Sequence, residues 1–352
     1  MDEEKIYFLA LSYNFELANN QNIGKLYKKL KSFKKIFYAN EDKLKVKKDW
    51  EKEYGNLKKL NGDILLPTDN KFPKILNNLK EVCLGLFIFK NNQTDILDNL
   101  NDDRIIKIAI VGTRKSSSLG KQTAFNFSKQ LSELGVINIS GLAYGIDEYS
   151  HKGALSIGAK NIAVIGCGLD IILKDTRKTL VEKIISNNGL IISEYPLKAK
   201  GLKHHFPLRN RIIAALSNGI LIIEAPLQSG ALITARYGLE YGKEIFAIPD
   251  SIYNKNYEGC LRLIQKGAKL VIDINDILKE FDFIMPLKIK NLKLSEKEKI
   301  IIEAIKQGKN TFNDLNQNIN LSIDEILSLL THLEIKGVIH NSGGRFYIQA
   351  DY

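Results

Sequence analysis

Between residues 105 and 280, short apolar runs alternate with amphipathic segments long enough to form helices. The runs are rich in β-branched residues and nearly free of charge, as in strands that are buried on both faces of a sheet. Strands that alternate with helices in this way predict a Rossmann-like α/β fold with a doubly wound, mainly parallel sheet. The expected strands are Ile105–Val111, Val136–Ile139, Ile162–Ile165, Leu190–Ile192, Ile220–Ile223, Ile245–Ile248 and Leu270–Ile272. The expected helices are Lys121–Leu134, Asp147–Ile157, Thr176–Ser186, Leu208–Leu216 and Leu232–Tyr241.

Helical patterns flank this region on both sides. Apolar residues recur at three- and four-residue spacing up to about residue 60, which predicts a small helical, SAM-like domain over residues 1–62. The sheet domain then covers residues 63–282, and residues 283–293 form the expected linker. Two S-x-x-E capping boxes and a final Ser-Gly-Gly turn predict three helices and a hairpin, the layout of a winged helix, over residues 294–352.

The chain carries a net charge of +11, and most of the excess lies near its start. Residues 25–59 hold thirteen lysines against five acidic residues. A basic surface attracts polyanions, because neutralised phosphates release their counterions. A lysine-rich composition can also reflect an AT-rich genome, so we expect this lysine-rich block to add only non-specific attraction that salt screens readily.

The sequence has no apolar run as long as a membrane span, and its first residues are acidic where a signal peptide would be basic. We therefore expect a cytoplasmic protein without a membrane partner. No metal site is expected either, because the three cysteines are isolated from one another. His204 and His205 are adjacent, but neighbouring side chains do not easily share one ion, and we expect no third ligand near them.

The candidate site lies in the loops after the strands, because ligands of an open parallel sheet bind beyond the carboxyl ends of its strands. The first expected strand runs into Gly112, Thr113 and Arg114, where a nicotinamide-binding protein would have G-x-G-x-x-G. This difference disfavours NAD and FAD. Free backbone N–H groups, a hydroxyl and a guanidinium can still bind a phosphate.

The loop that follows the second expected strand contains two glycines, Gly141 and Gly145, which allow a close backbone approach to a ligand or a neighbouring loop. Asp147 could act as an acid or base, but an aspartate at the start of a helix is more often its N-cap, and we favour the cap. His151, one turn later, is expected to be structural.

The segment from residue 203 to 211 is expected to be a basic loop that leads into a helix. It holds Lys203, Arg209 and Arg211 around the aromatic Phe206. Cations that contact phosphates, together with a ring that stacks on a base, are what single-stranded nucleic acid requires. The alternative is a solvated basic loop without a ligand.

A further anion pocket is expected at Ser229, Gly230 and Thr234, which place hydroxyls and amides at the start of a helix. The P-loop pattern Gly-x4-Gly-Lys-Ser/Thr is absent, so ATP hydrolysis is not expected. The carboxylates of the loops have no spacing that implies a catalytic pair. We therefore expect a binding site that has no catalytic residue and no cofactor.

Four motifs, in this order, resemble the DprA/Smf family of DNA-processing proteins: Ile110-Val-Gly-Thr-Arg114, Ser140-Gly-Leu-Ala-x-Gly-Ile-Asp147, Phe206-Pro-Leu-Arg-Asn-Arg-Ile-Ile213 and Ser229-Gly-Ala-Leu-Ile-Thr-Ala235. Upstream, Phe72-Pro-x-x-Leu76 and Leu86-Phe-Ile-Phe89 look like the family's lead-in to the sheet. The resemblance implies a homodimer, without enzymatic turnover, that binds and protects incoming single-stranded DNA in natural transformation and helps to load the RecA recombinase.

The resemblance also implies roles for single residues. Carried over by position, Arg114 and Lys203 would hold phosphates and Phe206 would stack on a base. Tyr144 stands where the family usually has arginine, a change that would exchange a phosphate contact for stacking. The expected DNA-binding residues are Gly112, Thr113, Arg114, Ser140, Gly141, Tyr144, Lys203, Phe206, Arg209, Asn210, Arg211, Ser229, Gly230 and Thr234.

Two other functions stay open at this point. Related Rossmann-like domains resemble the cytokinin-activating phosphoribohydrolases, whose catalytic glutamate follows a threonine by one turn. Here the first acidic residue after Thr234 is Glu240, so the expected carboxylate is missing. The other alternative is a nucleotide-sensing regulator with a duplex-reading winged helix.

The expected recognition helix of that winged helix, residues 322–336, carries three acidic residues against Lys336 alone, which disfavours insertion into a DNA groove. We expect the terminal domain to contact protein, or DNA only through Arg345. Deletion of residues 294–352 should then leave the affinity for single strands nearly unchanged.

Overall fold

The computed structural model describes the chain except for residues 1–2, 92, 282–293, 336–337, 343 and 349–352. The chain forms two compact units, Met1–Phe281 and Asp282–Tyr352. The expected linker over residues 283–293 lies outside the described residues, and the predicted domain boundaries stay predictions. No helix in the described part of the chain is long and apolar enough to span a bilayer.

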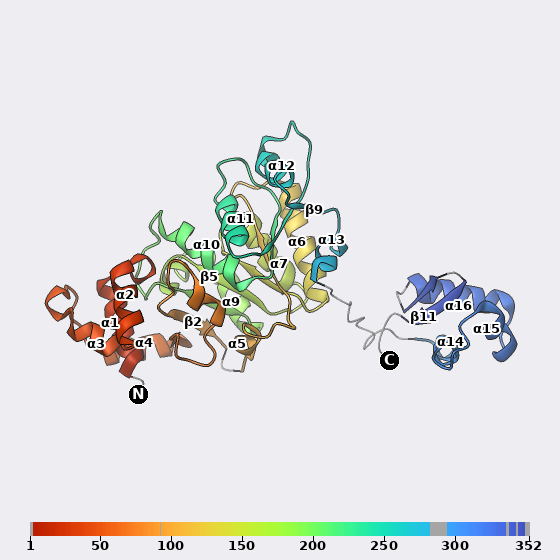
Figure 1. Cartoon of the computed structure of the whole chain (residues 1–352), viewed down its shortest axis with the longest axis horizontal. Coiled ribbons are helices and arrows are strands. Elements are labelled where there is room, and N and C mark those ends of the chain that lie inside the picture. The colour runs from red at the N-terminus through yellow and green to blue at the C-terminus, as the bar shows by residue number, and fades with distance from the viewer. Residues whose placement is uncertain (1–2, 92, 282–293, 336–337, 343, 349–352) are drawn as a thin grey trace. The chain divides into compact units, whose positions relative to one another are not determined.

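The first unit contains a nine-stranded sheet (Figure 1). Its parallel strands follow the apolar runs of the sequence and lie in the order β6-β5-β4-β3-β7-β8-β9. The chain winds outward from β3 in one direction and from β7 in the other, which confirms the predicted doubly wound, Rossmann-like α/β class. The bounds are β3 (Lys107–Val111), β4 (Ile137–Ser140), β5 (Asn161–Ile165), β6 (Leu190–Ser193), β7 (Gly219–Ile222), β8 (Glu244–Ala247) and β9 (Lys269–Leu270).

Two antiparallel strands extend one edge of this sheet. β1 (Gly62–Leu65) pairs with β2 (Leu86–Lys90), and β2 pairs with β6. The sequence marks β2 only as an apolar lead-in to the sheet and does not mark β1. They make the sheet mixed, while its centre stays parallel.

Helices cover both faces of the sheet, as its central strands require, because these strands are buried on both faces. Because successive side chains of a strand point to opposite faces, Ile162 and Val164 pack in the same core as α10 (His205–Leu216) and α11 (Ala231–Glu240). Ala163 and Ile165 pack in the core that contains α9 (Lys178–Ser186). The other helices of this unit's sheet region are α5 (Ile96–Asn99), α6 (Ser118–Glu133), α7 (Ile146–Leu155), α8 (Leu169–Ile172), α12 (Glu258–Gln265) and α13 (Asn275–Leu278).

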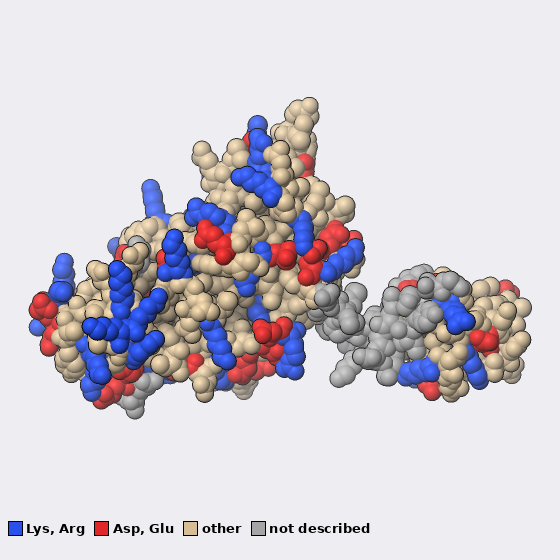
Figure 2. Space-filling view, in the orientation of Figure 1, with Lys and Arg blue, Asp and Glu red and all other residues tan. Residues whose placement is uncertain are grey.

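The N-terminal segment is helical, as predicted, but it shares a core with the sheet. The ring centroid of Phe8 lies 5.2 Å from that of Phe33 and 5.6 Å from that of Phe87 in β2. The helices are therefore part of one compact unit with the sheet. Lys and Arg side chains gather over them, as the lysine-rich block predicts (Figure 2). These helices are α1 (Glu3–Asn14), α2 (Gln21–Leu30), α3 (Phe33–Tyr38) and α4 (Trp50–Lys59).

The second unit contains three helices and a two-stranded sheet in the predicted order. Both predicted capping boxes form: the hydroxyl of Ser295 accepts from the N–H of Glu298 at 3.2 Å, and that of Ser322 accepts from the N–H of Glu325 at 3.3 Å. The winged-helix assignment itself stays a prediction. The elements are α14 (Glu296–Lys306), α15 (Phe312–Asn318), α16 (Ile323–Ile335), β10 (Ile339–Ser342) and β11 (Arg345–Ile348).

Candidate functional site

A cleft of about 610 Å³ lies at the carboxyl ends of β3 and β7, where the winding direction of the sheet changes. Ligands of doubly wound sheets bind at this switch point. The cleft is lined by the loops after β3, β4 and β7 and by the start of α10. It brings together the following predicted site residues: Gly112, Thr113, Arg114, Phe206, Arg209, Asn210, Ser229, Gly230 and Thr234.

The loops around the cleft are held together by their backbones. The N–H of Thr113 donates to the carbonyl of Glu224 at 2.7 Å, which joins the loop after β3 to the end of β7. A Cβ atom on Gly112 would lie 2.8 Å from that same carbonyl oxygen, so only glycine fits there. Gly145 has a φ of +81°, and a Cβ on it would lie 2.5 Å from the carbonyl oxygen of Thr113. These glycines are thus needed for close packing of the loops.

Arg114 and Phe206 meet in the cleft. Arg114 is exposed, and its guanidinium lies 4.8 Å from the centroid of the half-buried Phe206 ring. Arg114 follows β3, whereas Phe206 lies in the first turn of α10, so their contact follows from the fold. The guanidinium lies over the ring, so the cation and the aromatic side chain are held together by a cation–π contact.

The segment from residue 203 to 211 is mostly helix rather than the predicted loop. α10 begins at His205, three residues before the predicted start, and includes Phe206 and Pro207 in its first turn. Proline is tolerated there because the N–H groups of a first turn have no partner within the helix. The helix start therefore sets the position of the Phe206 ring.

Arg209 lines the cleft and connects the ends of two strands by hydrogen bonds. Its side chain is buried, and its Nη1 donates to the carbonyls of Gly141 and Val164. Its Nε donates to the side chain of Asn210 at 3.0 Å, and burial lowers its pKa to about 10. A Cβ on Gly141 would lie 2.5 Å from Nη1, which explains the glycine at that position.

Asp147 is not the N-cap that the sequence predicts. α7 begins at Ile146 with Gly145 as its N-cap, so Asp147 lies in the first turn. Its Oδ2 accepts from the N–H of Gly141 at 3.1 Å, and it lines the cleft. Burial raises the pKa of Asp147, although the nearby Arg209 charge opposes that shift.

The start of α11 forms the other wall of the cleft. The hydroxyl of Ser229 accepts from the N–H of Ala231 at 3.3 Å, and Asn210 Nδ2 donates to the carbonyl of Gly230 at 3.2 Å. Thr234 is buried one turn further on. The amino end of a helix carries partial positive charge and suits an anion.

Arg211 does not line the cleft, which corrects its inclusion in the predicted site. It is completely buried, and its Nη2 donates to both oxygens of Glu194, at 2.6 and 2.8 Å. Residues two apart on a helix face different directions, so Arg211 turns away from the cleft that Arg209 lines. Its role is an internal ion pair.

Four further predicted residues lie outside the cleft lining, and one of them is Gly141, the glycine against which Arg209 packs. Ser140 is buried and donates to the carbonyl of Ile110 at 2.6 Å. Tyr144 lines a separate groove of about 540 Å³, where the Arg177 guanidinium lies 5.0 Å from its ring centroid. Lys203 is exposed in the turn before α10.

The cleft also contains residues that the sequence reading missed. Lys255 follows β8, with its Nζ 3.6 Å from the carboxylate of Glu258. The rule that ligands bind at the carboxyl ends of strands would have found it, because β8 is parallel to β7 and ends at the same edge. Leu227 and Gln228 are exposed beside Ser229.

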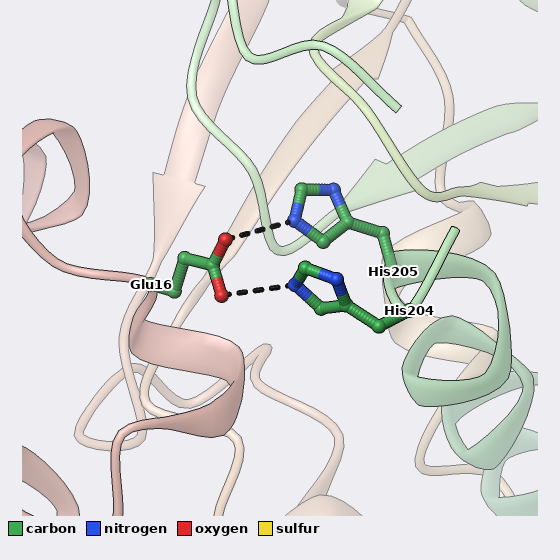
Figure 3. A group of neighbouring side chains, drawn as sticks. All are labelled: Glu16, His204 and His205. Carbon is green, nitrogen blue, oxygen red and sulfur yellow. Dashed lines mark hydrogen bonds and ion pairs between the residues drawn. The ribbon is translucent and has the colours of Figure 1, made fainter. Parts of the chain in front are cut away.

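A group of possible metal ligands lies apart from the cleft lining, which corrects the expectation that His204 and His205 have no third ligand near them. Glu16 lies 3.0 Å from His204 Nε2 and 3.4 Å from His205 Nε2 (Figure 3). The carboxylate comes from the N-terminal helices, nearly two hundred residues earlier, so no local pattern could indicate it.

Comparisons with known proteins point to one family. The model of the family "DNA recombination-mediator protein A" matches residues 63–282. The DNA processing protein DprA of Streptococcus pneumoniae is 42% identical over 215 residues, which are 61% of this chain and 73% of that protein. In two further curated relatives, both named protein Smf, the match spans only 54% and 47% of their length.

Solved structures agree with this result. The crystal structure of DprA from S. pneumoniae matches with a TM-score of 0.66 and 32% identity, over 80% of this chain and 99% of that one. A structure of DNA processing protein A from Helicobacter pylori, described by its single-stranded DNA binding mode, matches with a TM-score of 0.54 and 29% identity. That match covers 63% of this chain and 95% of the other.

Proposed function

The chain belongs to the DNA recombination-mediator protein A family, which includes the DprA and Smf proteins, and on this premise we propose that it binds single-stranded DNA in the cleft at the switch point of the sheet. The observation that carries the proposal is the contact between Arg114 and Phe206. A guanidinium can hold a backbone phosphate while the aromatic ring stacks on a neighbouring base. The single-stranded DNA binding of the H. pylori protein supports the same ligand here.

The walls of the cleft supply further phosphate donors in this proposal. Thr113 and Ser229 contribute hydroxyls, and the start of α11 contributes the positive end of its dipole. Lys255 adds a charge within the cleft, and Lys203 adds one from the turn before α10. Arg209 acts as a brace, because its Nη1 and Nε are already engaged by protein oxygens.

The cleft favours binding over hydrolysis. Its carboxylates in the described structure are Asp147, which accepts the Gly141 N–H, and Glu258, which lies near Lys255. Glu240, the first acid after Thr234, is exposed and lies 3.8 Å from Arg236. None of these three carboxylates, in the contacts just described, is paired as a base with a nucleophile. We therefore propose a binding protein without catalytic turnover.

The wider role that we propose is recombination mediation in the cytoplasm. The protein would act as a homodimer, protect incoming single strands in natural transformation and help to load RecA onto them. Membership of the recombination-mediator family supports this role. The lysine-rich block on the N-terminal helices would attract DNA non-specifically, and salt would weaken that contribution first.

The test is fluorescence anisotropy of a labelled oligothymidine and of a duplex of equal length at two salt concentrations. Arg114→Ala and Lys203→Ala are compared with the wild type. Arg104→Ala is the matched control, because this exposed arginine precedes the amino end of β3, whereas the cleft lies at the carboxyl end of that strand. Because each substitution removes one exposed cation, the comparison separates the effect of where the cation lies from the effect of losing a positive charge.

We expect the wild type to prefer the single strand, and we expect Arg114→Ala to bind it about tenfold or more weakly while Arg104→Ala binds normally. Equal affinity for the duplex, or equal losses in all the variants, would mean that the protein is a general polyanion binder. Nucleotides would then be the next ligands to assay.

A further inference from the structure

Glu16, His204 and His205 bring together three potential metal ligands from two distant parts of the chain. Glu16 lies just after α1, whereas the histidines lie at the start of α10. Figure 3 shows both imidazole rings turned toward the carboxylate, one opposite each of its oxygens. One ligand atom from each residue lies within 4.8 Å of the other two.

The spacing of these atoms suits a small tetrahedral ion. Zinc binds histidine nitrogen and carboxylate oxygen at about 2.0–2.1 Å, so two ligands of a tetrahedral site lie about 3.3 Å apart. The carboxylate of Glu16 lies 3.0 Å from one imidazole nitrogen and 3.4 Å from the other. These two distances end on different oxygens of the carboxylate, and the ligand atoms of the three residues lie within 4.8 Å of one another, so the two rings must move closer together to complete a three-ligand face.

The surroundings of His205 fix its ring in place. The imidazole is buried and stacks on the Tyr195 ring, with centroids 3.9 Å apart and planes 19° apart. Depending on the tautomer, its Nδ1 either donates to the carbonyl of Gly166 at 3.3 Å or accepts from the N–H of Leu202 at 3.3 Å. The tautomer with the proton on Nδ1 keeps the bond to the carbonyl, gives up the bond from Leu202 and leaves Nε2 as a ligand, which is the usual second-shell arrangement of a metal-bound histidine.

The donor set favours a transition metal over calcium or magnesium. Two imidazoles and one carboxylate are ligands of zinc, and such a set leaves a fourth position for water. Calcium and magnesium prefer sites made of oxygen atoms alone. The carboxylate also balances one of the two positive charges of the ion.

We propose that Glu16, His204 and His205 bind one zinc-like divalent transition-metal ion, which fastens the N-terminal helices to the start of α10. His205 immediately precedes Phe206, so the ion would steady the turn that positions this ring in the cleft. The metal site stands on these contacts alone and does not depend on DNA binding.

The test is metal binding by the full-length, tag-free chain. Zn²⁺ is titrated against a chromogenic chelator, and Co²⁺ is followed by its visible absorption, which reports tetrahedral coordination. The variants are Glu16→Gln and His204→Asn, whose side chains are half exposed and can be replaced without opening the core. His332→Asn removes an exposed histidine of the second unit and is the control.

We expect one equivalent of Zn²⁺ in the wild type and in the control, and affinity weakened at least about tenfold in each of the two variants. Zn²⁺ should raise the midpoint of thermal unfolding of the wild type and not that of the variants. Absence of binding at micromolar Zn²⁺ would overturn the proposal, as would unchanged affinity in both variants. If the variants unfold earlier by the same amount with and without a chelator, the cluster is only an ionic contact and the proposal fails.

Discussion

The guanidinium of Arg114 lies 4.8 Å from the centroid of the Phe206 ring, at the point where the loop after β3 meets the first turn of α10. Each residue alone is an ordinary surface feature of its loop. Together they form a surface with a cationic group and an aromatic face, which is suited to a phosphate and its neighbouring base. Because the two side chains touch, we expect them to act on a ligand as one unit.

The first prediction concerns this unit. Phe206→Ala should weaken binding of oligothymidine by about 1–3 kcal/mol, the usual value of stacking on one base. The double variant with Arg114→Ala should lose less than the sum of the two single losses, since each substitution also disturbs the other side chain. Anisotropy titrations of the four proteins measure the coupling. Strictly additive losses would show that the two residues contact DNA independently.

The second prediction concerns the buried ion pair of Arg211 and Glu194. Burial lowers the pKa of Arg211, but the charge of Glu194, its hydrogen bond and the other nearby groups together outweigh that effect, so that the pKa is raised. Arg211→Met leaves a buried carboxylate without its partner and should lower the free energy of unfolding by about 3–5 kcal/mol. Urea denaturation measures this loss, and the double variant with Glu194→Gln should recover part of it. A variant as stable as the wild type would contradict the assignment of Arg211 to the core.

The third prediction concerns Lys255, which the sequence reading missed. If it contacts one phosphate, Lys255→Ala should reduce the slope of log affinity against log salt by about 0.7 for a single strand. Lys266→Ala, an exposed lysine after α12 that lies outside the cleft lining, should leave the slope unchanged. If the two variants have equal slopes of log affinity against log salt, Lys255 does not contact a phosphate of the DNA.

The sequence predicted the sheet well because its strands are buried on both faces. Uninterrupted apolar runs are needed there, and each run became a parallel strand within a residue or two of its predicted bounds. β1 was not predicted, because its four residues include Asp63 and carry no long apolar run. The cleft followed from the rule for carboxyl ends of strands, which needs only the strand assignments.

The misassigned side chains have a common physical cause. The segment from residue 203 to 211 was treated as one basic loop whose cations all face a ligand, although the expected helix already began at Leu208. As a helix it directs Arg209 toward the cleft and Arg211 into the core. The direction of a side chain depends on the turn on which it lies, and a helix start is uncertain by several residues in a sequence. Glu16 could not be found because long-range contacts leave no local pattern.

The fourth prediction concerns pH and His151. This side chain is buried, with Nδ1 2.7 Å from Asn161 Oδ1, and burial lowers its pKa to about 4. The unfolded chain, in which histidine has a pKa of about 6.5, therefore binds more protons between these two values, and the stability falls as the pH falls through that window. We expect about 2 kcal/mol of loss from this group between pH 7 and pH 5.

Urea denaturation of the wild type and of His151→Gln at both pH values measures this effect. The glutamine can still donate a hydrogen bond to Asn161 but does not titrate, so its loss between the two pH values should be smaller by about 2 kcal/mol. If the stability of the two proteins depends on pH in the same way, the pKa of His151 is not lowered in the folded protein and the prediction is wrong.

The last prediction concerns the second unit. The residues that line the cleft all lie in the first unit, and α16 begins with Asp324 and Glu325. A hydrogen bond from Lys297 lowers the pKa of Glu325 to about 2, so this carboxylate is charged at any pH at which DNA binding is measured. Negative charge in that turn repels phosphates.

Deletion of residues 294–352 should therefore change the dissociation constant for oligothymidine by less than about twofold, which corresponds to about 0.4 kcal/mol. A loss of tenfold or more would assign a DNA contact to the second unit, and Arg345→Ala in the full chain would then show whether the β10–β11 hairpin makes it.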